Sequence, residues 1–204
     1  MSHYFAERPE VDPDEVVVDV ALADVSFTMV TARGVFSHGH VDTGTSLLLR
    51  AAPPPSATGD LLDLGCGSGA IALTMALRSP AATVWAVDVN DRARSLTEAN
   101  AERNGIDNVR VAAPADVPTA TRFATIWSNP PIRIGKPALQ QLLTDWLGRL
   151  ESDGEAVLVV QKHLGADSLQ RWLEAGGRPA ERLASRAGFR LLRIHAEPPP
   201  RAGG

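Results

Sequence analysis

Apolar and polar residues follow two different periods along this chain, and the change between them divides it into two parts. Residues 15–20 and 25–32 alternate apolar and polar side chains, which predicts two antiparallel strands. A short helix is expected at 46–51, followed by a proline-rich turn at 52–59. After residue 60, short apolar runs alternate with segments of helical period, which predicts β-α-β units.

The second part should form a doubly wound α/β fold, in which helices cover both faces of a mostly parallel sheet. Two final strands share a turn at Gly188 and would add an antiparallel hairpin. We therefore expect an N-terminal β-rich extension over 1–52, an α/β core over 60–196 and a disordered tail over 197–204. The strands of the core are expected at 60–64, 83–89, 108–112, 123–128, 155–161, 181–187 and 189–195, and its helices at 69–78, 91–104, 137–150 and 167–175.

Composition narrows the class of protein. The 204 residues are 44% hydrophobic and 22% charged, which suits one folded domain with a sizeable core. No apolar run is long enough to span a membrane, and the polar, acidic N-terminus does not resemble a signal peptide, so we expect a soluble, cytoplasmic protein. Cys66 is the single cysteine, which excludes an internal disulfide and a multi-thiolate zinc site.

Charge is divided unevenly between the two halves of the chain. The net charge is −4, but residues 1–102 carry 6 basic and 14 acidic side chains, whereas residues 103–204 carry 14 and 10. The positive half could face an anionic partner. The negative overall charge does not suit a domain that binds nucleic acid through its charge alone.

Three glycines at alternate positions follow the first strand of the core: Gly65, Gly67 and Gly69. Glycines allow the backbone to approach a ligand closely, and the helix that follows offers free N–H groups at its start. With Asp88 at the usual distance, the pattern also satisfies a dinucleotide-binding fingerprint. Asp63 places a carboxylate where a cationic ammonium group could lie, which favours S-adenosylmethionine over NAD.

The next two strands end in acidic residues that suit a nucleoside. Asp88, Val89 and Asn90 lie at the end of the second strand, where Asp88 could accept both hydroxyls of a ribose. Asp116 follows the third strand and could reach the adenine, although a solvated loop aspartate is a nearly equal interpretation. Cys66, inside the glycine loop, is expected to be a small packing residue rather than a nucleophile.

A second motif, Asn129-Pro130-Pro131, ends the apolar strand at 123–128. The prolines hold the backbone extended, so that the side-chain carbonyl of Asn129 and the backbone carbonyl of Pro130 would point toward the same place. Two converging acceptors suit an exocyclic amine, which has two N–H donors. A plain turn is the alternative, but the strand-end position predicts methyl transfer from a sulfonium to an amine.

These stretches together resemble the class I S-adenosylmethionine-dependent methyltransferases, and specifically the small-subunit ribosomal RNA guanine-N2 methyltransferase (RsmC-like) family. The glycine and Asn-Pro-Pro motifs are shared by many methyltransferases, whereas the N-terminal stretches and the Ile-Arg-x-Gly-Lys extension are more specific. The matching stretches are 3–5, 34–37, 42–45, 47–49, 63–69, 87–93, 100–105, 128–136, 159–162 and 165–166.

The resemblance implies a seven-stranded sheet whose last strand is antiparallel, with S-adenosylmethionine as cofactor, S-adenosylhomocysteine as its product, and ribosomal RNA or the small ribosomal subunit as partner. The residues expected to bind the cofactor are Asp63, Gly65, Cys66, Gly67, Gly69, Asp88, Val89, Asn90, Asp116 and Asn129. Those expected to position the amine are Asn129, Pro130 and Pro131. Those expected to contact the substrate are Phe36, Ile132, Arg133, Lys136 and Lys162.

The chain departs from the family pattern in two respects. Some members carry a second, N-terminal methyltransferase-like domain, and we expect this chain to hold only the catalytic one. Ile132 stands where many amine methyltransferases have an aromatic residue that stacks on the target base, so Phe36 is the candidate platform. The alternative acceptors are an adenine amine, a glutamine amide or a small-molecule amine. A non-catalytic RNA-binding module is the third reading.

A metal site is not expected. His38, His40 and Asp42 stand at alternate positions, as metal ligands sometimes do. No further cluster of ligand residues accompanies them in the sequence, and the family stretch that they belong to needs no metal.

Overall fold

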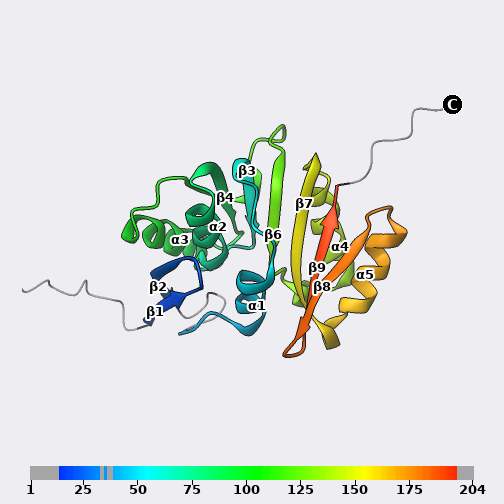
Figure 1. Cartoon of the computed structure of the whole chain (residues 1–204), viewed down its shortest axis with the longest axis horizontal. Coiled ribbons are helices and arrows are strands. Elements are labelled where there is room, and N and C mark those ends of the chain that lie inside the picture. Colours follow the sequence, from blue (N-terminus) through cyan, green and yellow to red (C-terminus); the bar gives the residue numbers. More distant parts are fainter. Residues whose placement is uncertain (1–13, 33–34, 36–38, 197–204) are drawn as a thin grey trace, which may run out of the picture.

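The computed structural model describes residues 14–32, 35 and 39–196 (Figure 1). Phe36, the candidate base platform, and the expected tail at 197–204 lie outside the described residues, as do the matching stretch at 3–5 and most of the one at 34–37. Among the described residues, no helix is long and apolar enough to cross a membrane.

A seven-stranded sheet forms the centre of the molecule, in the order β5-β4-β3-β6-β7-β9-β8. The five strands from β5 to β7 are parallel, and β9 is antiparallel to both of its neighbours. This confirms the doubly wound, mostly parallel fold with a final antiparallel hairpin. The strands are β3 (Thr58–Leu64), β4 (Ala81–Val87), β5 (Val109–Ala112), β6 (Phe123–Ser128), β7 (Leu150–Gln161), β8 (Ala180–Arg186) and β9 (Phe189–His195).

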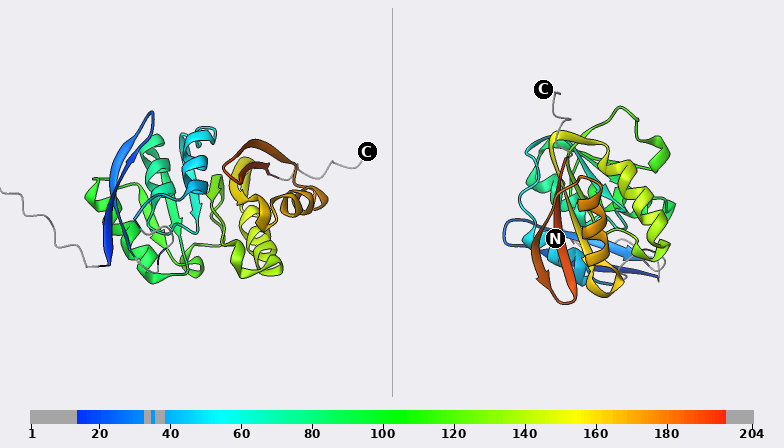
Figure 2. Two further views of the ribbon diagram at one scale, coloured as in Figure 1. Left: turned by 90° about the horizontal axis from the view of Figure 1, so that it is seen from below. Right: turned by 90° about the vertical axis from the view of Figure 1, so that its right-hand side faces the viewer.

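Helices cover both faces of this sheet (Figure 2). On one face, Leu61 and Trp127 pack with the apolar sides of α1 and α2. On the other face, Leu62 and Ile126 pack with α4 and α5. Alternate residues of each strand thus face opposite layers, which is why these strands read as continuous apolar runs. The helices are α1 (Thr43–Ala51), α2 (Ala70–Arg78), α3 (Asp91–Arg103), α4 (Lys136–Leu147) and α5 (Ala166–Ala175).

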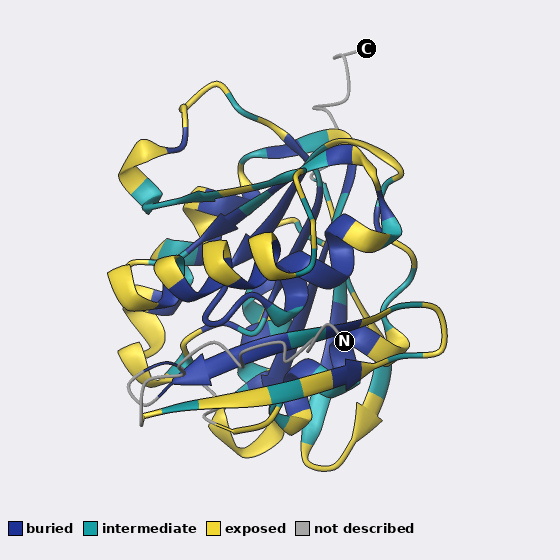
Figure 3. Ribbon diagram, turned by 90° about the vertical axis from the view of Figure 1, so that its left-hand side faces the viewer, coloured by how far each residue is buried: buried dark blue, intermediate teal, exposed yellow. Residues whose placement is uncertain are grey.

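A separate two-stranded sheet lies over α3, formed by β1 (Glu15–Ala21) and β2 (Ser26–Ala32). β1 is largely exposed and β2 is largely buried (Figure 3). The alternating pattern of the sequence predicted both strands correctly. The division of the chain into an extension and a core stays a prediction, since both parts share one apolar interior in which Leu73 of α2 packs with Phe27 of β2.

Two asparagines fasten this hairpin to the rest of the molecule: Asn100 of α3 and Asn104, the residue that follows the last turn of α3. The side chain of Asn100 donates to the Val30 carbonyl and accepts from the Val30 N–H, at 2.9 and 2.7 Å. One helical turn later, Asn104 makes the same pair of bonds with Thr28. A helical turn and a two-residue step along a strand are of similar length, roughly 5.4 and 6.6 Å, so the two amides match the free edge of β2.

Several boundaries differ from the expected ones for local reasons. α1 begins at Thr43 rather than residue 46, because the Asp42 carboxylate caps it by accepting the N–H of Gly44. β4 ends at Val87 rather than residue 89, so that Asp88 belongs to the following loop. The other bounds of these elements lie within a few residues of the expectation.

The largest boundary error concerns the strand expected at 155–161. β7 begins at Leu150, and its pairing with β6 shifts register between Phe123 and Thr125. Gly154 permits this irregularity, because a Cβ at that position would lie 2.8 Å from the carbonyl oxygen of Phe123. The helix expected to reach residue 150 ends at Leu147 instead.

Candidate active site

A cavity of about 480 Å³ opens where the parallel strands end. Its wall includes residues that follow β3, β4, β6 and β7, and the strand order reverses between β3 and β6. Ligands of open α/β sheets bind at such a reversal, and sites for small molecules usually measure about 300–1,000 Å³. In Figure 1 this edge of the sheet is the lower one, along which α1, the β1–β2 hairpin and the β8–β9 turn are drawn.

The glycine loop forms one wall of this cavity. Gly65, Gly67 and Gly69 have φ values of 80°, 57° and 92°, which residues with a side chain rarely adopt. A Cβ on Gly65 would stand in open space, with no atom within 4 Å, so the glycine keeps this part of the cavity open. A Cβ on Gly69 would lie 2.9 Å from Leu73, so that glycine serves close packing instead.

Asp88 is held at the cavity wall by backbone donors. Its Oδ2 accepts the N–H of Gly67 at 3.0 Å, and its Oδ1 accepts the N–H of Asn90 at 2.9 Å. Each oxygen keeps a second lone pair, so this carboxylate can still accept two hydroxyl groups. Arg94 donates to the Asp88 carbonyl at 2.7 Å, which anchors the loop that carries Asp88. The neighbouring Val89 is exposed and lines the cavity.

Asn90 caps the start of α3 and also lines the cavity. Its Oδ1 accepts the N–H of Arg92 at 3.0 Å, which is a helix N-cap bond. Its place beside Asp88 fits the expected cofactor contact, which stays a prediction.

Asp63 lies fully buried behind the glycine loop and does not line the cavity directly. Its Oδ2 accepts the N–H of Ala72 at 2.9 Å, whereas its Oδ1 has no hydrogen-bond partner among the described residues. Burial raises the pKa of this carboxyl to about 8; the nearby Asp88 charge adds to the rise, and the Ala72 hydrogen bond opposes it. The ionised form of a buried carboxyl without a partner is costly, so the ionised form of Asp63 would be stabilised by a cation placed near it.

The raised pKa of Asp63 makes stability depend on pH. The folded protein binds more protons than the unfolded chain between the ordinary value of 3.8 and about 8, so stability falls as pH rises through that window. Asp63→Asn removes the titration. We expect it to raise Tm by about 5 °C or more at pH 8 and to change it little at pH 4, given about 2–4 °C per kcal/mol for a chain of this size.

Thermal unfolding of the ligand-free protein at pH 4, 6 and 8 measures this effect. Asp153→Asn is the matched control, because Asp153 is an exposed carboxylate on β7. A Tm difference between Asp63→Asn and the wild type that stays constant across the three pH values would contradict the prediction.

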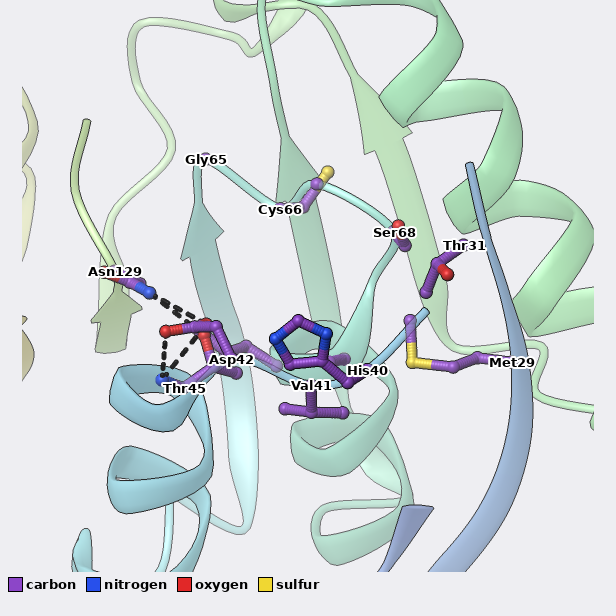
Figure 4. A pocket seen from close by; sticks show the side chains of 13 residues that line it. Met29, Thr31, His40, Val41, Asp42, Thr45, Gly65, Cys66, Ser68 and Asn129 are labelled. Atoms are coloured by element: carbon purple, nitrogen blue, oxygen red, sulfur yellow. Dashed lines mark hydrogen bonds between the residues drawn. The ribbon is translucent and has the colours of Figure 1, made fainter. Parts of the chain in front are cut away.

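Asn129, the first residue after β6, has a fixed side-chain amide. Its Nδ2 donates to Asp42 Oδ2 and to Thr45 Oγ1, both at 3.1 Å (Figure 4). An ionised carboxylate can only accept, so the nitrogen must face Asp42 and the amide cannot flip. Both amide hydrogens are thereby used, and Oδ1 accepts no hydrogen bond from the described residues. That oxygen can accept from a ligand in the cavity, which Asn129 lines.

The two prolines behave differently from each other. Pro130 is buried, and its carbonyl already accepts the N–H of Ile132 at 2.8 Å, so only its second lone pair is left for an amine. Pro131 is exposed and Ile132 is half-buried, and both line the cavity. The predicted convergence of acceptors therefore rests mainly on Asn129.

The remaining predicted residues lie at different distances from the cavity. Arg133 is exposed and lines it. Lys136, at the start of α4, and Lys162, after β7, are exposed but do not line it. Asp116 is also exposed, and the nearby cavity wall is formed by Pro114 instead. Their proposed contacts with RNA and adenine stay predictions.

Cys66 is buried, and burial raises the pKa of its thiol. Thr97 donates to the sulfur at 3.5 Å, which suits a neutral packing residue rather than a nucleophile. In the part of the chain that the structure describes, no group of three His, Cys, Asp or Glu side chains is arranged to hold a metal ion.

Asp42, Thr45 and Phe189 also belong to the site, although the sequence did not predict a place for them there. The first two belong to a stretch that matched the family, which was a usable signal. A smaller hollow of about 40 Å³, lined by Met29, Thr31 and His40, joins this stretch to the glycine loop (Figure 4). Phe189 also lines the main cavity, but it lies 60 residues after Asn129, and no local pattern marked it.

The family of this chain follows from comparisons with known proteins. The family model of the methyltransferase small domain matches residues 26–193. The uncharacterized protein YbxB of Bacillus subtilis is 38% identical over 175 residues, which cover 84% of this chain and 87% of that protein. Ribosomal RNA small subunit methyltransferase C of Ectopseudomonas mendocina is 33% identical over 187 residues, which cover 90% of this chain and 55% of that protein. This chain thus spans about half the length of the curated methyltransferases C that it matches.

A solved structure shows the same fold. The 16S rRNA N2 G1207 methyltransferase of T. thermophilus, in complex with AdoMet and guanosine, superposes with a TM-score of 0.74 at 24% identity, covering 92% of this chain and 52% of that chain. The chain belongs to the methyltransferase small domain family, as a class I S-adenosylmethionine-dependent methyltransferase, and within that family it is similar to the RsmC-like enzymes.

Proposed function

We propose that this chain transfers the methyl group of S-adenosylmethionine to the exocyclic N2 amine of a guanine in small-subunit ribosomal RNA. The observation that carries the proposal is the fixed amide of Asn129, whose nitrogen is held by Asp42 and Thr45. Its oxygen is left to accept at the wall of the cavity that Gly65 and Asp88 also line. The relatives named for ribosomal RNA methylation support the choice of substrate.

The cofactor fits the residues present. The open space at Gly65 admits a ligand against the backbone, and the Asp88 carboxylate has acceptor capacity for ribose hydroxyls. The unpaired Oδ1 of buried Asp63 favours positive charge in its vicinity. When bound, the cofactor supplies a methyl group on a positively charged sulfur, which is already activated toward an amine.

The chain therefore needs to position the amine more than to activate it. Asn129 Oδ1 would accept one N–H of the amine, and the second lone pair of the Pro130 carbonyl would accept the other. With both N–H groups held in this way, the nitrogen lone pair would be left free to attack. It would bond to the methyl carbon as the bond from that carbon to the cofactor sulfur breaks, and the methylated amine would release one proton to water.

RNA would reach this cavity past exposed cations. Arg133 lies at its wall, and Lys136 follows three residues later. Lys162 is exposed after β7, at the same edge of the sheet as Asn129. We propose that these side chains contact phosphate groups, which position a nucleic acid without reading its sequence.

The proposed function is tested with labelled S-adenosylmethionine and two substrates: small ribosomal subunits and their stripped RNA, both from a strain lacking this gene. The RNA is digested, and the labelled nucleoside is identified by mass. N2-methylguanosine is the expected product. Label in a methylated adenine or in a ribosomal protein would show that the methyl acceptor is that group instead of guanine. No label, in a protein that still binds S-adenosylhomocysteine, would favour a non-catalytic role.

A further inference from the structure

The cavity contains one aromatic side chain among the described residues that line it, Phe189. Ile132, which follows the Asn-Pro-Pro motif, has no ring with which to stack on a base. A base drawn out of RNA is usually held between aromatic or apolar side chains, because stacking replaces the contacts that it loses. The place of Phe189 in the fold decides whether it can supply such a surface.

Strand pairing brings Phe189 to the edge of the sheet where the parallel strands end. It is the first residue of β9 and pairs with Gln161, the last residue of β7. The N–H of Lys162 donates to the Gly188 carbonyl at 2.8 Å, which ties the β8–β9 turn to the end of β7. Because β7 is parallel to β6, its end lies at the same edge as Asn129.

Packing holds the Phe189 ring against the first turn of α1. A Cβ on Gly44 would lie 2.8 and 2.9 Å from two ring atoms of Phe189, so the ring lies directly on the glycine backbone. Gly44 stands between Asp42 and Thr45, the two residues that hold the Asn129 amide. The ring and the amide are thus supported by the same helical turn.

Phe189 remains only half-buried in this packing. One part of its surface is covered by α1, and another part lines the cavity, whose wall also includes Asn129, Pro131 and Ile132. Apolar ring surface that is held in place by packing and remains open to the cavity is suited to a flat ligand. A base whose amine is bound by Asn129 would cover it.

We propose that Phe189 is the aromatic platform on which the target base rests, in the role that an aromatic residue after Pro131 would otherwise have. The inference rests on the proposed function, in that the ligand is the base whose amine is methylated. It makes Phe189 a base-binding residue supplied by the last strand of the sheet.

The test compares Phe189→Leu with Phe189→Trp. Guanosine affinity is measured by calorimetry on protein saturated with S-adenosylhomocysteine, and kcat/KM is measured with stripped small-subunit RNA. Phe189→Leu keeps an apolar side chain but removes the ring, so we expect both quantities to fall by about 10-fold or more. Phe189→Trp should keep both within about threefold, because it retains a stacking face. Affinity for S-adenosylhomocysteine should stay within about threefold in both variants.

Phe27→Leu is the matched control. Phe27 is a buried phenylalanine of β2 that packs in a separate apolar cluster and does not line the cavity. The same substitution there should lower Tm and leave guanosine affinity unchanged. Phe36→Leu tests the candidate suggested by the sequence: a loss there, with none in Phe189→Leu, would overturn the proposal.

Other outcomes separate this inference from the proposed function. Guanosine binding needs no methyl transfer. If the wild type methylates no RNA but guanosine affinity depends on the ring, the proposed function fails and the platform stands. If N2-methylguanosine forms but Phe189→Leu binds guanosine as the wild type does, the platform alone fails. If Phe189→Leu loses guanosine and S-adenosylhomocysteine affinity equally, the ring shapes the whole cavity wall. That result would also overturn the proposal that Phe189 is a platform for the base.

Discussion

Asn129→Ala should lower kcat by about 1,000-fold while leaving the affinity for S-adenosylmethionine within about threefold. The substitution removes the fixed acceptor oxygen and leaves its former partners, Asp42 and Thr45, to bond with each other or with water. Loss of one preorganised hydrogen-bonding group in an active site costs about 100- to 1,000-fold in kcat, and lost alignment of the amine adds to it. Single-turnover methyl transfer and calorimetry with the cofactor measure the two quantities separately.

Thr45→Val provides a graded comparison. It removes one of the two acceptors that hold the Asn129 amide and leaves the Asp42 carboxylate in place. We expect a smaller decrease in kcat, of about 10-fold, since the amide is held less tightly but keeps its orientation.

If Asn129→Ala lowers cofactor affinity as much as it lowers kcat, Asn129 mainly builds the cofactor pocket and the amine assignment is wrong.

Asp88→Ala should weaken cofactor binding by about 100-fold or more. The carboxylate is prearranged by the backbone N–H groups of Gly67 and Asn90, and it offers two charge-assisted hydrogen bonds to ribose hydroxyls. Each such bond contributes about 1.5–3 kcal/mol, and every 1.4 kcal/mol is a factor of ten in affinity. The substitution also frees the glycine loop from its anchor, which adds to the loss.

Calorimetric titration with S-adenosylhomocysteine measures this effect without any methyl acceptor. Asp91→Ala is the control, because Asp91 is an exposed carboxylate three residues further along that pairs with Arg94. Its affinity should stay near that of the wild type. An Asp88→Ala protein that binds the product as tightly as the wild type would refute the ribose assignment.

Local patterns were sufficient to predict most of the fold, because helix and strand periods report which face of each element is buried. The alternation of apolar runs after residue 60 predicted the doubly wound sheet, and all seven strands are present. The errors fall where a contact distant in sequence decides the boundary. β7 starts at Leu150 because it pairs with Phe123, and the irregularity at Gly154 is visible only once the two strands lie together.

The chemistry of the site divides in the same way. Three features of the site can be recognised from short stretches of sequence. They are the glycines that need positive φ, the carboxylate after the second strand and the asparagine before two prolines. Asp88 and Asn129 do line the cavity, as their strand-end positions predicted. Their roles as ligands stay predictions until the variants are measured.

Local patterns in the sequence establish the fold class, the edge of the sheet that carries the site, and the types of residue that stand there. How those residues are held depends on contacts between elements that are distant in the chain. Asn129 is oriented by Asp42 and Thr45, more than 80 residues earlier, and α3 completes the edge of β2 through Asn100. Phe189 reaches the cavity because β9 pairs with β7. Periodicity reports burial on one element, whereas these contacts depend on how elements distant in the chain meet in space.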